Sequence, residues 1–181
     1  HRHAAAIREL LRRGLTKAQS LVEALQNSQP TVSRALKVLG EEVLHIGAGR
    51  SIQYVLRDAS RADLTATVHR VTAQGKLEFL GELVPVYPEG FVMLQVDGQR
   101  LHSDGLPWWI YDMRPQGYLG RAFSLRHGAR LSLPENLNDW SDGHALRALL
   151  SHGEDLPGNL LIGATALESF VNAPQPVPIA A

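Results

Sequence analysis

The segment from Ser28 to Leu39, SQPTVSRALKVL, gathers hydrogen-bonding and cationic side chains at helical spacing. Val32, Leu36 and Leu39 recur at intervals of four and three residues, which predicts one buried stripe on an amphipathic helix. Amide and hydroxyl groups bind base edges, and Arg and Lys bind phosphate or guanine, so the opposite stripe is suited to a nucleic acid. An ordinary solvated helix face would carry similar residues, so the neighbouring elements must decide. The outward residues are Gln29, Thr31, Ser33, Arg34 and Lys37.

Residue types that support catalysis are scattered along the chain. Phosphoryl transfer needs a phosphate cradle, a lysine and metal-holding carboxylates, but Lys76 is the single lysine after residue 57. His144 and His152 are eight residues apart, too far to share a helical turn as metal ligands. The chain contains no Cys, which excludes disulfides and favours a reducing, cytoplasmic location. We therefore expect no catalytic residue, metal or cofactor in this chain.

The elements around the polar stripe follow from local sequence signals. Gly14 is a suitable end for a first helix, and Thr16 is expected to be the N-cap of a second. Pro30 stands where a first-turn proline is tolerated. After Gly40, two runs of strand-forming residues flank Gly47-Ala48-Gly49, which predicts a hairpin. The expected order is helices over 3–13, 16–25 and 29–39, then a hairpin over 43–57.

Three helices followed by a glycine-tipped hairpin resemble the winged helix-turn-helix domain of bacterial regulators. In those proteins the third helix enters the major groove of DNA. The resemblance implies that Gln29, Thr31, Ser33 and Arg34 face DNA, that Lys37 contacts its backbone, and that Arg50 at the hairpin tip reaches the minor groove or a phosphate. Two alternatives remain open. Ser28 and Thr31 could be plain capping residues, and winged-helix domains also serve as protein-interaction modules.

The charge distribution divides the chain. Residues 1–57 carry nine Lys or Arg against four Asp or Glu, whereas the remainder carries nine against fourteen, although the whole chain is neutral. Opposite signs suggest two domains with different partners. The segment 58–64 is polar and aperiodic, as expected of a linker, and 65–172 forms the second domain. The proline-punctuated end, 173–181, is expected to be a linker or a frayed terminus.

The second domain is expected to be a small, mostly antiparallel α+β fold. Its strands are expected within 66–73, 76–87 and 90–103, and short connections favour antiparallel neighbours. Together with YDMRPQGYLGRAF (111–123) and EDLPGNLLIG (154–163), they resemble the N-terminal subdomain of the HipA family of toxin serine/threonine kinases. One branch of that family carries a winged helix ahead of this subdomain, in the order expected here.

The resemblance implies a parent protein that is a serine/threonine protein kinase. In the family, the phosphate-binding loop, its self-phosphorylated serine and the catalytic and metal-binding aspartates lie further along the chain, and none has a counterpart here. ATP and Mg²⁺ are therefore expected only for that kinase core, which this chain lacks.

The sequence thus predicts the DNA-binding and regulatory part of a HipA-type toxin–antitoxin kinase. Expected partners are double-stranded operator DNA, a kinase core in cis or in trans, and a second copy of the chain. A membrane partner is not expected. Two other functions stay open. One is an antitoxin-like module that binds a kinase core in trans, and the other is a one-component transcription factor with a ligand pocket beside Trp108, Tyr111 or Tyr118.

Overall fold

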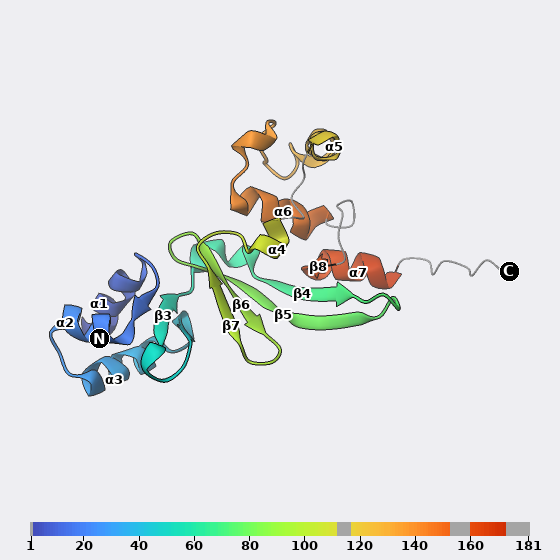
Figure 1. Cartoon of the computed structure of the whole chain (residues 1–181). Helices are drawn as coiled ribbons and strands as arrows, with labels where there is room; N and C mark the ends of the chain where they lie inside the picture. Colours follow the sequence, from blue (N-terminus) through green and yellow to red (C-terminus); the bar gives the residue numbers. More distant parts are fainter. Residues whose placement is uncertain (1, 112–116, 153–159, 173–181) are drawn as a thin grey trace. The chain divides into compact units, whose positions relative to one another are not determined.

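A computed structural model describes residues 2–111, 117–152 and 160–172. The chain is an α+β protein with two sheets and several helices (Figure 1). It divides into two compact units, the first formed by His1–Thr65 with Glu82–Gly105 and the second by Ala66–Gly81 with Leu106–Ala181. The expected tail, 173–181, lies outside the described residues, as do parts of the two HipA-like motifs.

Three helices form the beginning of the first unit, as the sequence predicted. They are α1 (Arg2–Leu11), α2 (Ala18–Leu25) and α3 (Gln29–Leu39). Their apolar stripes meet in one core, because residues three and four apart lie on the same side of a helix. The buried members of this core are Ala4, Ile7, Leu11, Leu21, Val32, Ala35, Leu39 and Leu56.

The start of the second helix differs from the expectation. Thr16 is not its N-cap: Thr16–Lys17 form the short strand β1, and Lys17 precedes α2 without a side-chain cap. The Thr16 hydroxyl donates instead to the carbonyl of Gly14 at 3.0 Å. Pairing of Thr16 with Tyr54, far along the chain, outweighs the local capping preference.

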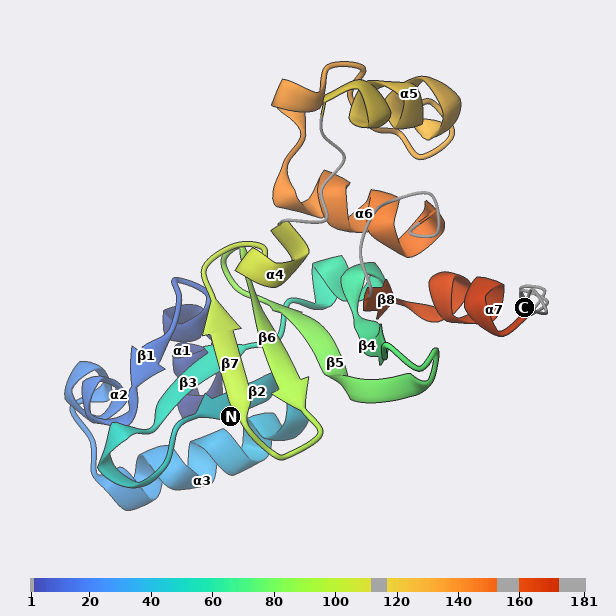
Figure 2. The ribbon, with the colours of Figure 1, turned by 45° about the vertical axis from the view of Figure 1, so that its right-hand side comes forward.

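The expected hairpin is present and completes a three-stranded antiparallel sheet of order β1-β3-β2. Its strands are β2 (Val43–Ile46) and β3 (Gln53–Leu56), with Leu44 opposite Val55. Figure 2 shows β1 and β3 beside the helices. Tyr54 and Leu56 of β3 pack against the helical core, so the sheet and the helices share one apolar interior.

The first unit also contains strands from later in the chain. The C-terminal half of β5 (Leu77–Val86) lies next to β6 (Gly90–Gln95), and β6 pairs with β7 (Arg100–Ser103). A second apolar cluster joins them to the hairpin because side chains of both sheets meet in it. Its buried members are Leu44, Val55, Val84, Val86 and Val92.

The segment expected to be the linker forms a short 3-10 helix, η3 (Ala59–Leu64), tied to the turn after β5. Asp58, only 4% exposed, accepts hydrogen bonds from Ser60 and from Arg61 Nε, the latter at 2.7 Å. Arg61 Nη2 donates to the carbonyl of Val86 at 2.6 Å, and its guanidinium lies 5.3 Å from the Phe91 ring centroid. These contacts hold η3 to the first unit.

The described part of the second unit contains a smaller sheet region and four α-helices. The N-terminal half of β5 lies next to β4 (Ala66–Val71), and β4 pairs antiparallel with β8 (Leu160–Ile162). Among the described residues, no helix is long and apolar enough to cross a membrane. The helices are α4 (Trp108–Tyr111), α5 (Gly117–His127), α6 (Asp142–His152) and α7 (Ala164–Asn172).

Trp108 and Trp109 are adjacent aromatic residues, a residue type common in strands, but they lie on a helix. They begin the short helix α4, which follows Pro107, and Ile110 N donates to the Pro107 carbonyl at 3.0 Å. Aromatic residues favour strands, but the proline opens a helical turn here. Ile110 of this helix is fully buried.

Candidate nucleic-acid interface

The helix α3 begins at a capped N-terminus. Ser28 is the N-cap residue, and its hydroxyl accepts a hydrogen bond from the backbone N–H of Thr31 at 3.4 Å. Pro30 occupies the first turn, where its missing N–H leaves no helical hydrogen bond broken. The capping alternative for Ser28 is therefore confirmed. The cap fixes where the helix starts and thus which residues its outward face carries.

One side of α3 is anchored in the helical core. Val32, Ala35 and Leu39 are at most 4% exposed, and Leu36 packs at the edge of the same cluster. The spacing of the three buried residues is one helical stripe. Because this stripe is buried, the opposite face is held at a defined orientation.

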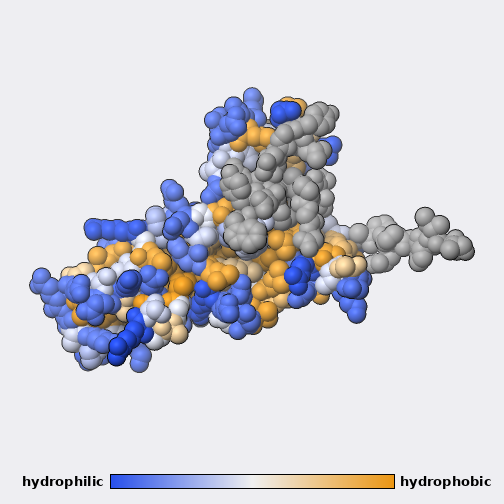
Figure 3. Space-filling view, in the orientation of Figure 1, coloured by the Kyte–Doolittle hydropathy of each residue, from blue (hydrophilic) through white to orange (hydrophobic). Residues whose placement is uncertain are grey.

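The opposite side of α3 faces solvent. Arg34 and Lys37 are exposed, and neither forms an ion pair among the residues that the structure describes. Figure 3 shows hydrophilic residues over the region of α3. An unpaired guanidinium and ammonium keep their full attraction for an external anion. The other residues predicted here are also accessible: Gln29 and Ser33 are exposed and Thr31 is half-buried.

A short chain of hydrogen bonds orients one cation on this face. The Ser28 and Thr31 hydroxyls lie 3.0 Å apart, and Arg34 Nη2 donates to Thr31 Oγ1 at 3.4 Å. The partner groups are exposed hydroxyls, which carry no charge. The hydrogen bonds therefore position Arg34 without cancelling its charge. Thr31 thus serves as a local partner of Arg34, while its half-exposed side chain remains on the outward face.

The tip of the hairpin places Arg50 on an exposed turn. Residues Gly49–Ser51 form a single 3-10 turn, η2, in which Ser51 N and Oγ both donate to the Ala48 carbonyl. Gly47 has φ +83°, and an added Cβ would lie 3.1 Å from the Ser51 carbonyl oxygen, so this turn requires glycine there. Arg50 is exposed and forms no ion pair within the described residues.

The sequence interpretation overlooked one residue of this face. Val38 on α3 is 60% exposed, although it is apolar and close to Arg34 and Lys37. Its position is one helical turn after Arg34, so both lie on the same side of the helix. An exposed valine on a polar face is recognisable from the same periodicity that identified the cations.

Two polar side chains of the second unit, those of Ser124 and His144, form local structural contacts. Ser124 is 7% exposed and donates to the carbonyl of Glu135 at 3.2 Å. His144 Nδ1 accepts from Ser141 N at 2.9 Å at the start of α6. Among the described residues, no three His, Cys, Asp or Glu side chains come together as a metal site. These groups therefore stabilise local turns.

Comparison with known proteins gives two related results. A family model described as "YjjJ-like toxin, middle domain" matches residues 62–171, which is more than half of the chain. The chain is also 31% identical over 172 residues to Toxin YjjJ from Escherichia coli (strain K12). That alignment covers 94% of this chain but 39% of the relative, so the chain spans well under half of the relative's length. No solved structure matches. Because the family model covers most of the second unit's sequence and the toxin alignment covers both units, the chain belongs to the YjjJ-like toxin family.

Proposed function

We propose that this chain is the DNA-binding and regulatory part of a toxin of this family. In this proposal α1–α3 with β1–β3 form a winged helix, and α3 enters the major groove of an operator. The observation that carries the proposal is the outward face of α3, where Arg34 and Lys37 stand exposed and without ion pairs in the described part of the chain.

Each predicted contact has a distinct chemical role. Arg34 is the candidate for a bidentate bond to guanine, because its fork matches the two acceptors of that base in the major groove. Lys37 and Arg50 are candidates for phosphate contacts, which set affinity and register but not sequence. Gln29, Thr31 and Ser33 supply amide and hydroxyl groups beside them. A second copy of the chain would bind the second half of a palindromic site.

The activity of the whole protein is also part of the proposal. The HipA-like motifs support a parent protein that phosphorylates a protein substrate on serine or threonine, with ATP and Mg²⁺ bound by a kinase core that this chain lacks. The DNA-binding part and the kinase core would then belong to one polypeptide, so that operator binding and kinase activity are physically linked. The family assignment supports the toxin part of this proposal.

Duplex binding by charge-reversed variants tests the proposal. Arg34→Glu/Lys37→Glu should weaken binding of an operator-containing duplex by at least about tenfold, because two attractive phosphate or base contacts become repulsive. The matched control is Arg121→Glu/Arg126→Glu, two exposed arginines on α5 with the same change in charge. An equal weakening in both double variants would show a general charge effect and contradict a specific interface on α3.

The two other functions make different predictions for the same chain. An antitoxin-like module would inhibit a separately supplied kinase core. Its affinity for duplex DNA would be no higher than that of the variant Arg34→Glu/Lys37→Glu. A ligand-sensing factor would need a pocket beside Trp108, Tyr111 or Tyr118, whose side chains lie outside the described part. Duplex affinity in the micromolar range or weaker for every duplex tested would favour the interaction module.

A further inference from the structure

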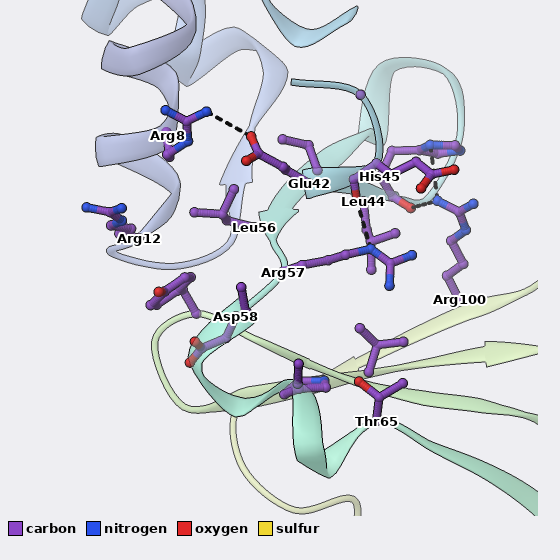
Figure 4. Close-up of a pocket in the computed structure, with 18 residues that line it drawn as sticks. Arg8, Arg12, Glu42, Leu44, His45, Leu56, Arg57, Asp58, Thr65 and Arg100 are labelled. Carbon is purple, nitrogen blue, oxygen red and sulfur yellow. Dashed lines mark hydrogen bonds and ion pairs between the residues drawn. The ribbon is translucent and has the colours of Figure 1, made fainter. Parts of the chain in front are cut away.

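The first unit contains an open cleft of about 1030 Å³ on the side of the hairpin base (Figure 4). All of its lining residues belong to this unit. They come from α1 and Arg12, residues 40–42 after α3, the hairpin, the segment 57–65, β5 with Tyr87, and β7. Four arginines line it: Arg8, Arg12, Arg57 and Arg100. What the cleft can bind depends on which of these four charges are already neutralised.

Three carboxylates also line the cleft, and two of them are occupied. Glu42 pairs with Arg8 at 2.9 Å, while Arg12 is neutralised by Glu9 at 2.7 Å. Asp58 is almost fully buried and binds Arg61 and Ser60. Glu41 is exposed and forms no ion pair in the described residues. Arg57 and Arg100 are therefore opposed by one accessible carboxylate, so the open part of the cleft is cationic.

Arg57 and Arg100 are held in place by carbonyl groups and not by carboxylates. Arg57 Nε donates to the carbonyl of Glu41 at 2.8 Å, which leaves both Nη groups without a partner in the described residues. Arg100 Nη1 donates to the carbonyl of His45 at 3.2 Å and lies 3.3 Å from its Nδ1. A carbonyl orients a guanidinium but leaves its charge available. Both arginines are half-buried, so their positions are also restrained by packing.

Arg57 directly follows β3 and Arg100 begins β7, and Figure 4 shows Arg100 directed toward His45 of β2. Apolar side chains form another part of the wall, including the buried Leu44, Leu56 and Val84. Oriented guanidinium groups with free N–H pairs match the oxygens of phosphoryl groups, and apolar walls strengthen such bonds by excluding water.

We propose that this cleft binds a small ligand with two linked phosphoryl groups, one contacted by Arg57 and the other by Arg100. Two anchored cations from separate strands favour a ligand with two anionic centres over a single phosphate. The site is separate from the outward face of α3, because none of the residues assigned to DNA contact lines it. The inference therefore stands independently of DNA binding.

Calorimetric titration of the chain with inorganic pyrophosphate at low ionic strength tests this site. We expect saturable binding with one site per chain, and Arg57→Ala/Arg100→Ala should weaken it by at least about tenfold, since each charged hydrogen bond contributes strongly. Arg121→Ala/Arg126→Ala on α5 is the matched control, with the same change in charge at two exposed arginines outside the cleft, and should bind pyrophosphate as the parent does.

A substitution that should strengthen pyrophosphate binding separates loss of the site from loss of folding, because an unfolded variant could not bind more tightly. Glu41→Gln keeps the backbone carbonyl that holds Arg57 but removes the opposing carboxylate, so pyrophosphate should bind about two- to threefold more tightly. Inorganic phosphate should bind more weakly than pyrophosphate. Absence of saturable binding, equal weakening in both alanine pairs, or weaker binding by Glu41→Gln would each overturn the proposal.

Discussion

Two arginines of the first unit sit at the same spacing from a local partner but serve opposite purposes. Arg61 binds Asp58 three residues earlier at 2.7 Å, and Arg34 donates to Thr31 three residues earlier at 3.4 Å. The partner of Arg61 is a buried carboxylate, which cancels its charge. The partner of Arg34 is a hydroxyl, which leaves its charge available. The partner's chemistry therefore separates a structural cation from one displayed to solvent.

The surroundings strengthen the same contrast. Arg61 also donates to the Val86 carbonyl and lies over Phe91, so it connects η3 to the turn between β5 and β6. Arg34 is exposed on α3, and within the described residues its side chain bonds only to Thr31 of the same helix. Removal of the Arg61 side chain should therefore lower the stability of the fold. Removal of the Arg34 side chain should instead weaken the proposed binding of duplex DNA.

The largest expected effect is on stability. Arg61→Ala should lower the free energy of unfolding by about 3 kcal/mol, because it leaves the buried carboxylate of Asp58 without its cation. Arg34→Ala should change it by no more than about 0.5 kcal/mol, as for most exposed positions. Urea unfolding followed by circular dichroism measures both. Equal stability of the two variants would contradict the division of roles.

A smaller effect is expected at the start of α3. Ser28→Ala removes the N-cap bond to Thr31 N and should cost about 1 kcal/mol. Ser33→Ala is the matched control, since Ser33 is exposed within the same helix and makes no capping bond. Its stability should equal or exceed that of the parent, because alanine favours helix. Thermal unfolding compares the pair, and a greater destabilisation in Ser33→Ala would show that the cap is not what fixes α3.

The smallest effect is a pH dependence of stability that arises from Asp58, the partner of Arg61. Burial alone would raise the pKa of the Asp58 carboxyl, but hydrogen bonds from Arg61 and Ser60 and the charge of Arg61 together hold the pKa below its ordinary value of 3.8. Because the folded pKa is the lower one, the stabilisation is present above the unfolded pKa and disappears as the pH falls through the folded value.

Urea midpoints measured from about pH 5 down to about pH 3 test this dependence. The parent and Arg34→Ala should lose stability together as the pH falls. Asp58→Asn cannot ionise at this position and should show a shallower decline. Parallel curves for all three proteins would mean that Asp58 does not contribute to the acid sensitivity.

The local elements could be predicted from the sequence because their signals are local. The stripe of Val32 and Leu39, the cap at Ser28 and the glycine-rich hairpin tip each depend on neighbouring residues. The strand β1 was missed because two residues carry no periodic pattern, and it exists through pairing with β3. At 108–109 the preceding proline, and not the strand propensity of the aromatic pair, decides the conformation.

The outward face of α3 and the cleft also differ in how far their residues are apart in the sequence. The outward face of α3 could be predicted because all its residues lie on one helix. The cleft could not, because Arg57, directly after β3, and Arg100, on β7 of the other sheet, are brought to one surface only by folding. The carbonyl bonds that anchor them have no signature in the sequence.

The most direct test of the central claim is the salt dependence of duplex binding by the parent and by Arg34→Ala/Lys37→Ala. If α3 binds DNA through these cations, the slope of log affinity against log salt should become shallower by about one for each phosphate that the variant no longer neutralises. The parent should show a steep slope and the double variant a clearly reduced one. Identical slopes and affinities would contradict the assignment of α3 as the DNA-binding helix.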